Sequence, residues 1–515
     1  MPDLAKEKQE FSRLKPNLRR VWADIKADPM YEHTSVIVPS LSVNQEELAK
    51  VTGASYYEER LLFALIRLRN PNARVIYVTS QPVHAEIVDY YLQMLEGIPV
   101  SHARQRLHMM SVYDASSRPL TAKILERPRM LARLRSRIDD ASRAYLTCYN
   151  STDLERRLAV SLGIPLNGVD PELLSFGTKS GSRKTFTEAG VRHPAGYEDL
   201  YNEQDIVDAL QSLKSARPGL RRAVVKLNEG FSGEGNGLFD YPDDNSTDAI
   251  RTALHALRFS SLSECYTEFI CKFAIMGGIV EEMIDAREVR SPSVQMRIHP
   301  DGQSAIVSSH EQVLGGSTGQ VYLGCRFPAS NDYRSLLQEE ANKIGRTLSE
   351  KGVIGRFGID FLVCRDANGQ WQSYAIEINL RMGGTTPPFH ALEFLTGGQL
   401  DESSGLFRTP NQQTKFYSAT DNLKSAEYRG LLPEDLFEII TRHGLNFRHT
   451  TGTGVLFYMI GALSQYGKIG MTAIGDSAAD AQDLFERTTA LLDAQTGDAG
   501  HGEASPIFDR YLSME

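Results

Sequence analysis

The most informative stretch of this 515-residue chain spans residues 353–386 and reads VIGRFGIDFLVCRDANGQWQSYAIEINLRMGGTT. Two apolar runs, 357–364 and 373–380, flank a polar segment, 365–370, that contains Asp, Asn and Gly. Residues of these three types favour tight turns, and β-branched and aromatic residues favour strands. The pattern therefore predicts two β-strands joined by a turn.

Three oxygen-bearing side chains interrupt these apolar runs. Asp360 lies in the first run, and Glu377 and Asn379 lie two residues apart in the second, so a strand places the latter two on one face. If the strands pair, Asp360 lies beside that face. Buried carboxylates need a compensating cation or hydrogen bonds, and oxygen ligands of this kind suit Mg²⁺. A solvated hairpin with acids on its outer face remains the alternative.

Three residues directly after the second run add to this interpretation. Arg381 can bind a phosphate or a carboxylate through its fork of donors. Gly383 and Gly384 have no side chain and would let a ligand approach the backbone. One short motif is only a hypothesis, so the rest of the chain has to be consistent with it.

Composition limits the class of protein. The chain has 41% hydrophobic and 23% charged residues, which is typical of a soluble globular protein, and its length suggests about three domains. No apolar run reaches the ~20 residues of a membrane helix, and the N-terminus has no secretory signal pattern. The net charge of −9 argues against nucleic-acid binding. We therefore expect neither a membrane nor a nucleic-acid partner.

Cysteine usage points to a reducing compartment. The five cysteines are odd in number and form no CxxC pair, which argues against a disulfide framework or a structural zinc site. The sequence predicts a cytoplasmic protein.

The first third of the chain alternates strand-like and helix-like segments. Residues 1–33 form a charged, helical arm that could contact a partner. Over residues 34–170, strand patterns at 35–39, 74–79 and 144–149 alternate with helix patterns at 56–68, 85–95 and 152–162. This alternation predicts a Rossmann-like domain with a parallel sheet. No GxGxxG follows the first strand, so no dinucleotide is expected there.

The next segment contains candidate phosphate-binding residues. Lys179 begins a basic helix that ends at Gly190, and Lys226 lies in a strand that leads into a glycine-rich loop. The loop residues of interest are Ser232, Gly233, Gly235 and Gly237. Such a loop can present N–H groups to a phosphate, although it is not a Walker A loop. A solvated helix face and a flexible hairpin are the alternatives.

Strand patterns continue to residue 313. Residues 279–290 (IVEEMIDAREVR) predict a strand, a turn and the start of another strand, with Glu281 and Glu288 as their acids of interest. Arg297, His310 and Gln312 are polar residues within the two following strand patterns. Acids in a strand–turn–strand are mostly exposed and carry no functional signal alone.

After residue 400 the composition changes. Residues 401–421 are polar and predict a linker or flap. Residues 422–496 predict a small α+β domain, and residues 497–515 a tail. This C-terminal domain could cover an acceptor site or form a homodimer contact, and the residues do not distinguish these options.

In their order along the chain, these features resemble the ATP-grasp superfamily over about residues 170–400. The phrases PSVQMRIHPDG, SSHEQVLGG, YLGCRFPA and EINLRMGG are similar to its carboxylate–amine ligase branch, which includes the pheganomycin-type peptide ligases. The segment GVLFYMIGALSQYGKIGMTAIG also resembles that branch. The resemblance implies an α/β (α+β) protein in which an ATP-grasp domain, residues 171–400, follows the Rossmann-like domain. The lid subdomain would end near residue 285 and the metal-binding subdomain would occupy 286–400.

The resemblance also implies a role for each matching residue. Lys179 and Lys226 would contact ATP phosphates, and the backbone of Ser232–Gly237 would cover them. Glu281, Met283 and Ile284 would form the adenine hinge, and Glu288 would bind the ribose. Asp360, Glu377 and Asn379 would hold the metal, and Arg381 and Arg297 would contact the transferred phosphoryl group. Substrate contact would fall to His310, Gln312, Gly383 and Gly384. Met283 departs from the aromatic residue that is common at this hinge.

The implied activity is an ATP-dependent ligation of a carboxylate and an amine. ATP with Mg²⁺ (or Mn²⁺) would convert the acid to an acyl phosphate, and the amine of an amino acid or peptide would then attack it, releasing ADP and phosphate. Two alternatives remain open: an ATP-grasp enzyme that phosphorylates or thioesterifies its substrate, and a nucleotide-binding module without catalysis. The sequence does not identify the acid or the amine.

Overall fold

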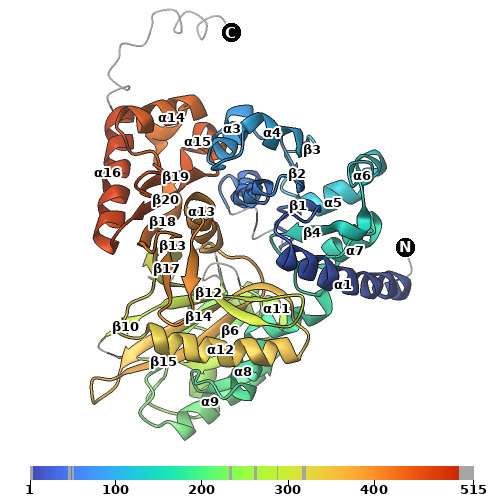
Figure 1. The fold of residues 1–515 in the computed structure, drawn as a ribbon. Coiled ribbons are helices and arrows are strands. Elements are labelled where there is room, and N and C mark those ends of the chain that lie inside the picture. The colour runs from blue at the N-terminus through green and yellow to red at the C-terminus, as the bar shows by residue number, and fades with distance from the viewer. Residues whose placement is uncertain are drawn as a thin grey trace, which may run out of the picture.

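The computed structural model describes residues 4–43, 48, 51–230, 235–259, 264–286, 288–315 and 321–497. Three β-sheets organise these residues: a four-stranded front sheet, a five-stranded lid sheet and an eleven-stranded central sheet (Figure 1). The protein is therefore of mixed α/β and α+β type, as predicted.

The front sheet is parallel and has helices on both faces. Its strands follow the order β3-β2-β1-β4, with β1 (Thr34–Val38), β2 (Arg74–Thr79), β3 (Leu107–Ser111) and β4 (Ala144–Cys148). One face packs on η1 (Ala54–Arg69), α3 (Ala85–Gln93) and α4 (Val100–Gln105). The other packs on α5 (Leu120–Leu125), α6 (Pro128–Arg135) and α7 (Asp153–Leu162). The predicted strand–helix alternation is confirmed, and β3 is an additional strand that the sequence pattern did not reveal.

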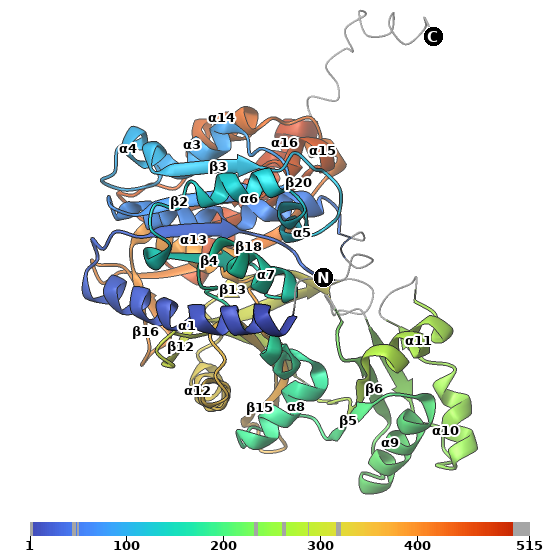
Figure 2. The same cartoon turned by 90° about the vertical axis from the view of Figure 1, so that its right-hand side faces the viewer.

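The lid sheet is antiparallel and has its own core. It contains β5 (Gly196–Leu200), β9 (Gly278–Glu282), β6 (Arg222–Leu227), β7 (Asn236–Asp240) and β8 (Arg258–Phe259). Side chains on one face pack with α9 (Glu203–Ala216), α10 (Thr247–Leu254) and α11 (Tyr266–Met276). Figure 2 shows this unit projecting from the lower part of the molecule, apart from the front sheet.

The central sheet contains the predicted hairpin. Its first part comprises β10 (Val289–Arg290), β11 (Pro292–Ile298), β12 (Ser304–Gly315), β13 (Val321–Phe327), β14 (Gly355–Arg365) and β15 (Trp371–Asn379). One face packs on α8 (Lys179–Glu188) and α12 (Arg334–Glu350). On the opposite face, α13 (Thr386–Thr396) packs against η1 of the front sheet. The central sheet thus lies between its own helices and the front domain.

The predicted linker at residues 401–421 is wrong. The structure has strands there: β16 (Gln399–Asp401), β17 (Leu406–Arg408) and β18 (Thr414–Lys424). β18 pairs with both β13 and β20 (Lys468–Gly475), so the central sheet continues into the C-terminal unit. Phe407 and Tyr417 are fully buried and hold these strands, although polar neighbours hide them in the sequence.

The rest of the C-terminal unit packs around β18 and β20. It includes η4 (Ala426–Tyr428), α14 (Pro433–Arg442), β19 (Gly454–Tyr458), α15 (Ala462–Tyr466) and α16 (Ala478–Gly497). The largest hydrophobic core of the molecule joins this unit to α13 and to one face of the front sheet. In the described part of the chain, no helix is long and apolar enough to span a bilayer. All five cysteines are free thiols.

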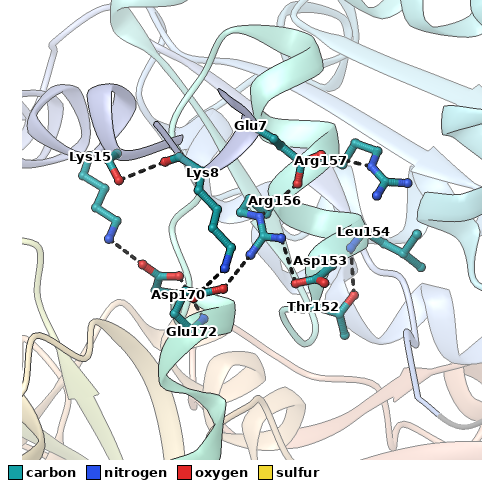
Figure 3. Close-up of polar contacts among 11 residues, drawn as sticks. Glu7, Lys8, Lys15, Thr152, Asp153, Leu154, Arg156, Arg157, Asp170 and Glu172 are labelled. Carbon is teal, nitrogen blue, oxygen red and sulfur yellow. Dashed lines mark hydrogen bonds and ion pairs between the residues drawn. The ribbon is translucent and has the colours of Figure 1, made fainter. Parts of the chain in front are cut away.

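The first helix, α1 (Leu4–Ala27), is packed along the front domain and is not a detached arm. Its buried Glu7 accepts hydrogen bonds from Arg156 Nε at 2.9 Å and Arg157 Nε at 3.2 Å, both on α7 (Figure 3). Arg156 also forms ion pairs with Asp153 at 3.0 Å and with Glu172 at 3.2 Å, near η3 (Pro171–Gly177). The fully buried guanidinium is therefore matched by several carboxylates.

Candidate functional site

The hairpin of β14 and β15 brings the predicted metal-binding residues together. In its antiparallel register Asp360 lies opposite Glu377, and Gly358 lies opposite Asn379. Asn379 Nδ2 donates a hydrogen bond to Asp360 Oδ2 at 2.9 Å. The predicted pairing of the two strands is confirmed, and the three side chains form one cluster.

A neighbouring strand completes the surroundings of Asp360. Gln312 of β12 donates from Nε2 to Asp360 Oδ1 at 2.8 Å. Burial and the charge of Glu377 raise the pKa of Asp360 to about 6, whereas Arg381 and the two amide donors oppose this rise. Two carboxylates placed together in a buried site each favour a cation beside them.

Lys179 links this cluster to the lid. It is the first residue of α8, and its Nζ lies 3.2 Å from Glu377 Oε1. Its backbone N–H donates to the carbonyl of Asn228 at 3.2 Å, directly after β6 of the lid sheet. Asn228 Oδ1 also accepts from the N–H of Ser180 at 2.9 Å. The lysine is 5% exposed, so its charge lies inside the junction between lid and central sheet.

Lys226 and Glu281 lie on the face of the lid sheet that is turned away from its helices. The ammonium of Lys226 on β6 pairs with the carboxylate of Glu281 on β9. Arg183 of α8 approaches the same carboxylate, with Nη1 3.4 Å from Oε2. Glu281 and Lys226 are both buried. The residues assigned to the adenine hinge and to the phosphates thus hold one another across paired strands.

The remaining hinge residues lie nearby or at the sheet edge. The N–H of Met283 donates to the carbonyl of Arg222 at 3.2 Å, and Ile284 is half-buried. Glu288 forms ion pairs with Arg365 at 3.1 Å and with Arg290 at 3.3 Å. These pairs hold Glu288 where β10 meets the far end of β14, whereas Asp360 lies near the middle of β14.

The glycine-rich loop joins β6 to β7. Ser232 and Gly233 lie outside the described residues. Gly235 has a φ of 76°, and its carbonyl accepts from the N–H of Leu227 at 2.9 Å. A Cβ on Gly237 would lie 3.2 Å from the methyl groups of Leu257. The C-terminal side of the loop is therefore fixed closely against the lid sheet.

Arg381 and the two following glycines lie where the front domain meets the hairpin. Arg381 Nη1 donates to the carbonyl of Met382 at 3.2 Å. The N–H of Met382 donates to the carbonyl of Tyr149 at 3.2 Å, just beyond the carboxyl end of β4. Gly383 donates its N–H to Thr386 Oγ1 at 3.0 Å, at the start of α13. A Cβ on Gly384 would lie 2.7 Å from the Tyr322 ring, so a side chain does not fit there.

Two predicted residues do not join this cluster. His310 is fully buried, and its Nε2 lies 2.5 Å from the hydroxyl of Tyr417. Burial lowers its pKa to about 3, which favours a neutral imidazole inside the core, and its substrate contact stays a prediction. Arg297 lies four residues along β11 from Ser293, which pairs with Asp360. Its guanidinium lies 4.6 Å from the centre of the Trp22 ring.

Sequence reasoning missed Arg356 and Gln295. Residues 356, 358 and 360 alternate along β14, so Arg356 lies on the same face as Asp360. In the register of β11 and β14, Gln295 lies opposite Gly358 and Arg297 opposite Arg356. The alternation was a usable signal for Arg356, but the expected strand began one residue later.

The cluster offers fewer side-chain ligands than a metal site built entirely from protein side chains would need. Within the described ranges, no group of three or more His, Cys, Asp or Glu side chains gathers around one point. Asp360 and Glu377 provide two carboxylates, and Asn379 an amide oxygen. Mg²⁺ is usually bound through one or two carboxylates together with substrate phosphates, so this set fits a metal that arrives with a nucleotide.

Two family models match the chain. A model described as IQCH-like, ATP-grasp matches residues 171–254 and 251–403, which include both the lid sheet and the hairpin. A model of the PGM1 C-terminal domain matches residues 435–488 in the C-terminal unit.

Two curated relatives match nearly the whole chain. L-propargylglycine–L-glutamate ligase of Streptantibioticus cattleyicolor is 29% identical over 466 residues, covering 89% of this chain and 94% of that protein. IQ motif-containing protein H of Danio rerio is 22% identical over 516 residues and covers 90% of this chain. The match covers 48% of the zebrafish protein, so the chain spans about half its length.

Solved structures share the architecture. A biotin carboxylase from Campylobacter jejuni in complex with β,γ-ATP has a TM-score of 0.54 at 13% identity, over 94% of this chain and 97% of that chain. The biotin carboxylase domain of Hydrogenobacter thermophilus 2-oxoglutarate carboxylase, crystallised with MgADP, ADP and bicarbonate, also has a TM-score of 0.54, at 10% identity over 88% of this chain and 89% of that chain. At these identities the likeness establishes the fold.

Proposed function

We propose that this chain, whose residues 171–403 match an ATP-grasp family model, is an ATP-dependent ligase that joins a carboxylate to an amine. The products besides the amide would be ADP and phosphate. The observation that carries the proposal is the contact of Lys179 with Glu377. Lys179 begins α8, whose first two N–H groups are bonded to Asn228 next to the lid strand β6. Glu377 belongs to the half-buried carboxylate pair that would hold a divalent ion beside the phosphates of a nucleotide.

Asp360, Glu377 and Asn379 would hold Mg²⁺, which would supply neutralisation of the charge on the phosphates of ATP. The raised pKa of Asp360 is consistent with a site that gains from an added cation. Lys179 and Lys226 would approach the phosphates from the lid side, each released in part from its present carboxylate partner. Solved structures with this fold contain ADP, MgADP and β,γ-ATP, which supports nucleotide binding by this chain.

The chemistry suits these residue types. A carboxylate is a poor electrophile, because oxide would be its leaving group. Transfer of the γ-phosphoryl group of ATP gives an acyl phosphate, and an amine then displaces phosphate to form the amide. Phosphoryl transfer depends mainly on positioning and charge neutralisation, which two lysines and Arg381 would provide. The loop between β6 and β7 would cover the site and exclude water.

One relative supports amide formation between amino acids. The Streptantibioticus protein is an L-propargylglycine–L-glutamate ligase, and its similarity covers 89% of this chain. We propose amino acids or short peptides as the acid and amine substrates.

The test is the substitution Glu377→Gln. It keeps the side-chain shape but removes one of the two carboxylates and the partner of Lys179. We expect amine-dependent ADP release to fall about 100-fold or more, because positioned charge contributes rate factors of this size. Asp366→Asn, in the turn of the same hairpin, is the matched control and should keep wild-type turnover.

Mass analysis of the product separates the reaction classes. An amide with ADP and phosphate supports ligation, whereas a stable phosphorylated acid or a thioester would point to the other ATP-grasp chemistries. Unchanged ADP release in Glu377→Gln would overturn the assignment of the metal site.

A further inference from the structure

A second charged cluster lies on the same face of the central sheet as Asp360. Arg297 of β11 and Arg356 of β14 are directly paired in the sheet, and we call them the arginine pair. Both are partly buried between the central sheet and the front domain. Burial, together with the charge of Arg356, lowers the pKa of Arg297 to about 9. The two guanidinium groups therefore repel one another in a poorly solvated place.

No anion of the protein is bonded directly to this pair. Among the described residues, neither guanidinium forms a hydrogen bond or an ion pair, and that of Arg297 lies over the ring of Trp22. The acid nearest in influence is Glu393 of α13, which is bound to His390 Nδ1 at 2.5 Å. Buried charges in proteins are normally paired and hydrogen-bonded. The arginine pair thus has no directly bonded anion, although the charge of Glu393 acts on both guanidinium groups at longer range.

A cavity lies beside Arg297. It has a volume of about 290 Å³ and is lined by Arg297 and Arg67, by the polar side chains of Asn70 and Asn167, and by apolar residues that include Trp22 and Tyr145. Trp22 Nε1 is buried without an acceptor, so the cavity wall has another unsatisfied donor. Few polar groups in a mostly apolar wall are typical of small-molecule sites.

Gly358 of β14 and Gln295 of β11 separate the arginine pair from the candidate metal site. Gly358 lies between Asp360 and Arg356 and has no side chain, and the amide of Gln295 lies over it. Gln295 lies opposite, and its Nε2 would be 2.9 Å from a Cβ at Gly358. Four residues of strand separate Asp360 from Arg356, or about 13 Å. A phosphate bound at the metal site and the long arginine side chains would both extend into this space, so the distance that a substrate has to span would be shorter than the backbone separation.

From this arrangement we propose that Arg297 and Arg356 bind a second, non-reacting carboxylate of the acid substrate. The acid would then be a dicarboxylate of about the length of an acidic amino acid, with one carboxyl group beside Asp360 and the other on the arginine pair. The inference rests on the proposed ligase function, since it assigns the far end of that substrate. Guanidinium groups bind carboxylates through paired, charge-assisted hydrogen bonds.

The activity test uses hydroxylamine as the amine, because the natural acceptor is unknown. An acyl phosphate and hydroxylamine give a hydroxamate and release phosphate, which can be measured for any acid. Glutarate serves as the dicarboxylate probe and pentanoate as the matched monocarboxylate. We expect the wild-type kcat/KM for glutarate to exceed that for pentanoate about 10- to 100-fold, the range of a charged hydrogen-bond pair.

Substitutions of the pair should remove this preference. In Arg297→Met and Arg356→Met, the ratio of the two kcat/KM values should fall towards one, mainly through a higher KM for glutarate. Lysine at either position should restore part of the ratio, because it keeps the charge but not the fork. Arg334→Met is the control: this buried arginine lies on α12, on the other face of the sheet, and donates to carbonyl oxygens, so its loss should leave the ratio unchanged.

A binding measurement separates this inference from the ligase proposal. Calorimetric titration of glutarate without nucleotide should show binding to the wild type that weakens about 10-fold or more in either methionine variant. Without glutarate, the methionine variants should melt at a higher temperature than the wild type, because an unmatched charge has been removed.

Equal binding in wild type and variants, or a wild type that uses pentanoate as well as glutarate, would overturn the inference while leaving the ligase proposal intact. Arginine-dependent glutarate binding without hydroxamate from any acid would instead overturn the ligase proposal.

Discussion

Glu58 of η1 is a buried acid that lies close to the front sheet. It is 7% exposed and accepts hydrogen bonds from the N–H and the hydroxyl of Ser80, at 2.5 and 2.6 Å. Burial raises its pKa to about 7, although the hydrogen bonds and Lys123 oppose this rise. In the unfolded chain a glutamate titrates near 4.3. The folded protein therefore keeps this proton over a pH range in which the unfolded chain has lost it.

This difference predicts a pH-dependent stability. Between about pH 4.5 and 7 the folded state binds more protons than the unfolded state, so the free energy of unfolding falls as pH rises and then levels off. Glu58→Gln cannot ionise and should gain on the order of 1–3 kcal/mol relative to wild type between pH 5 and pH 8. Urea denaturation at both pH values measures it. The exposed Glu96→Gln is the control, and a constant difference between Glu58→Gln and wild type would refute the prediction.

At this scale, the sequence predicts side chains whose signals are local. Asp360, Glu377 and Asn379 follow from strand alternation within one hairpin, and the structure brings them together. His310 could not be placed in the same way, because the hydroxyl that it contacts belongs to Tyr417, more than 100 residues later. That no anion among the described residues is bonded directly to Arg297 is also invisible in the sequence, because it depends on how β11, β14 and α13 are arranged in space.

Among single elements, α1 shows how a charged helix can be fixed in place. Its buried Glu7 bridges Arg156 and Arg157 of α7, whereas Glu10, one turn later, pairs with Arg13 at the surface. Removing one partner of a buried ion pair is costly, while surface pairs contribute little. Whether an acid on this helix is buried or exposed therefore determines how much its ion pair contributes to the free energy of unfolding.

Glu7→Gln should lower the free energy of unfolding by about 1–3 kcal/mol, below the full cost of a lone buried charge because Arg156 keeps Asp153 and Glu172. Glu10→Gln should change it by less than about 0.5 kcal/mol. Thermal denaturation of both variants provides the comparison. Equal effects would mean that α1 does not depend on this bridge for its attachment.

The strands of residues 399–424 show the limit of prediction at the element scale. Polar composition predicted a linker, but β18 forms hydrogen-bonded ladders with β13 on one side and β20 on the other. A central strand satisfies its backbone through distant partners, and a few buried side chains such as Tyr417 are enough to hold it. Strands in the hairpin, whose partners are adjacent in sequence, were predicted correctly.

The whole molecule divides into a large body and a lid with separate cores. One core joins the front sheet, α13 and the C-terminal unit, and direct bonds reinforce it: Tyr91 donates to the carbonyl of Phe457 at 3.0 Å, and Gly461 donates to Glu59 at 3.1 Å. The lid sheet packs on its own helices in another core. α8 connects it with the central sheet: Lys179 pairs with Glu377, and the backbone N–H of Lys179 donates to the carbonyl of Asn228, next to β6, at 3.2 Å.

This division into two cores predicts which elements a core substitution destabilises. Leu463 in the large core and Leu210 in the lid core are both fully buried, so each Leu→Ala change should cost about 2–5 kcal/mol. Hydrogen exchange read by mass spectrometry should show that Leu463→Ala accelerates exchange in β19 and β20 and also in η1 and β2, because these elements share one core. Leu210→Ala should accelerate exchange in β6, β7 and β9 alone.

Such independence is what a lid needs if it is to open for a nucleotide without loosening the surface that is proposed to bind the acid. Faster exchange in β2 on damage to the lid would mean that the molecule opens as one unit, and the site would then have to admit its substrates by another route.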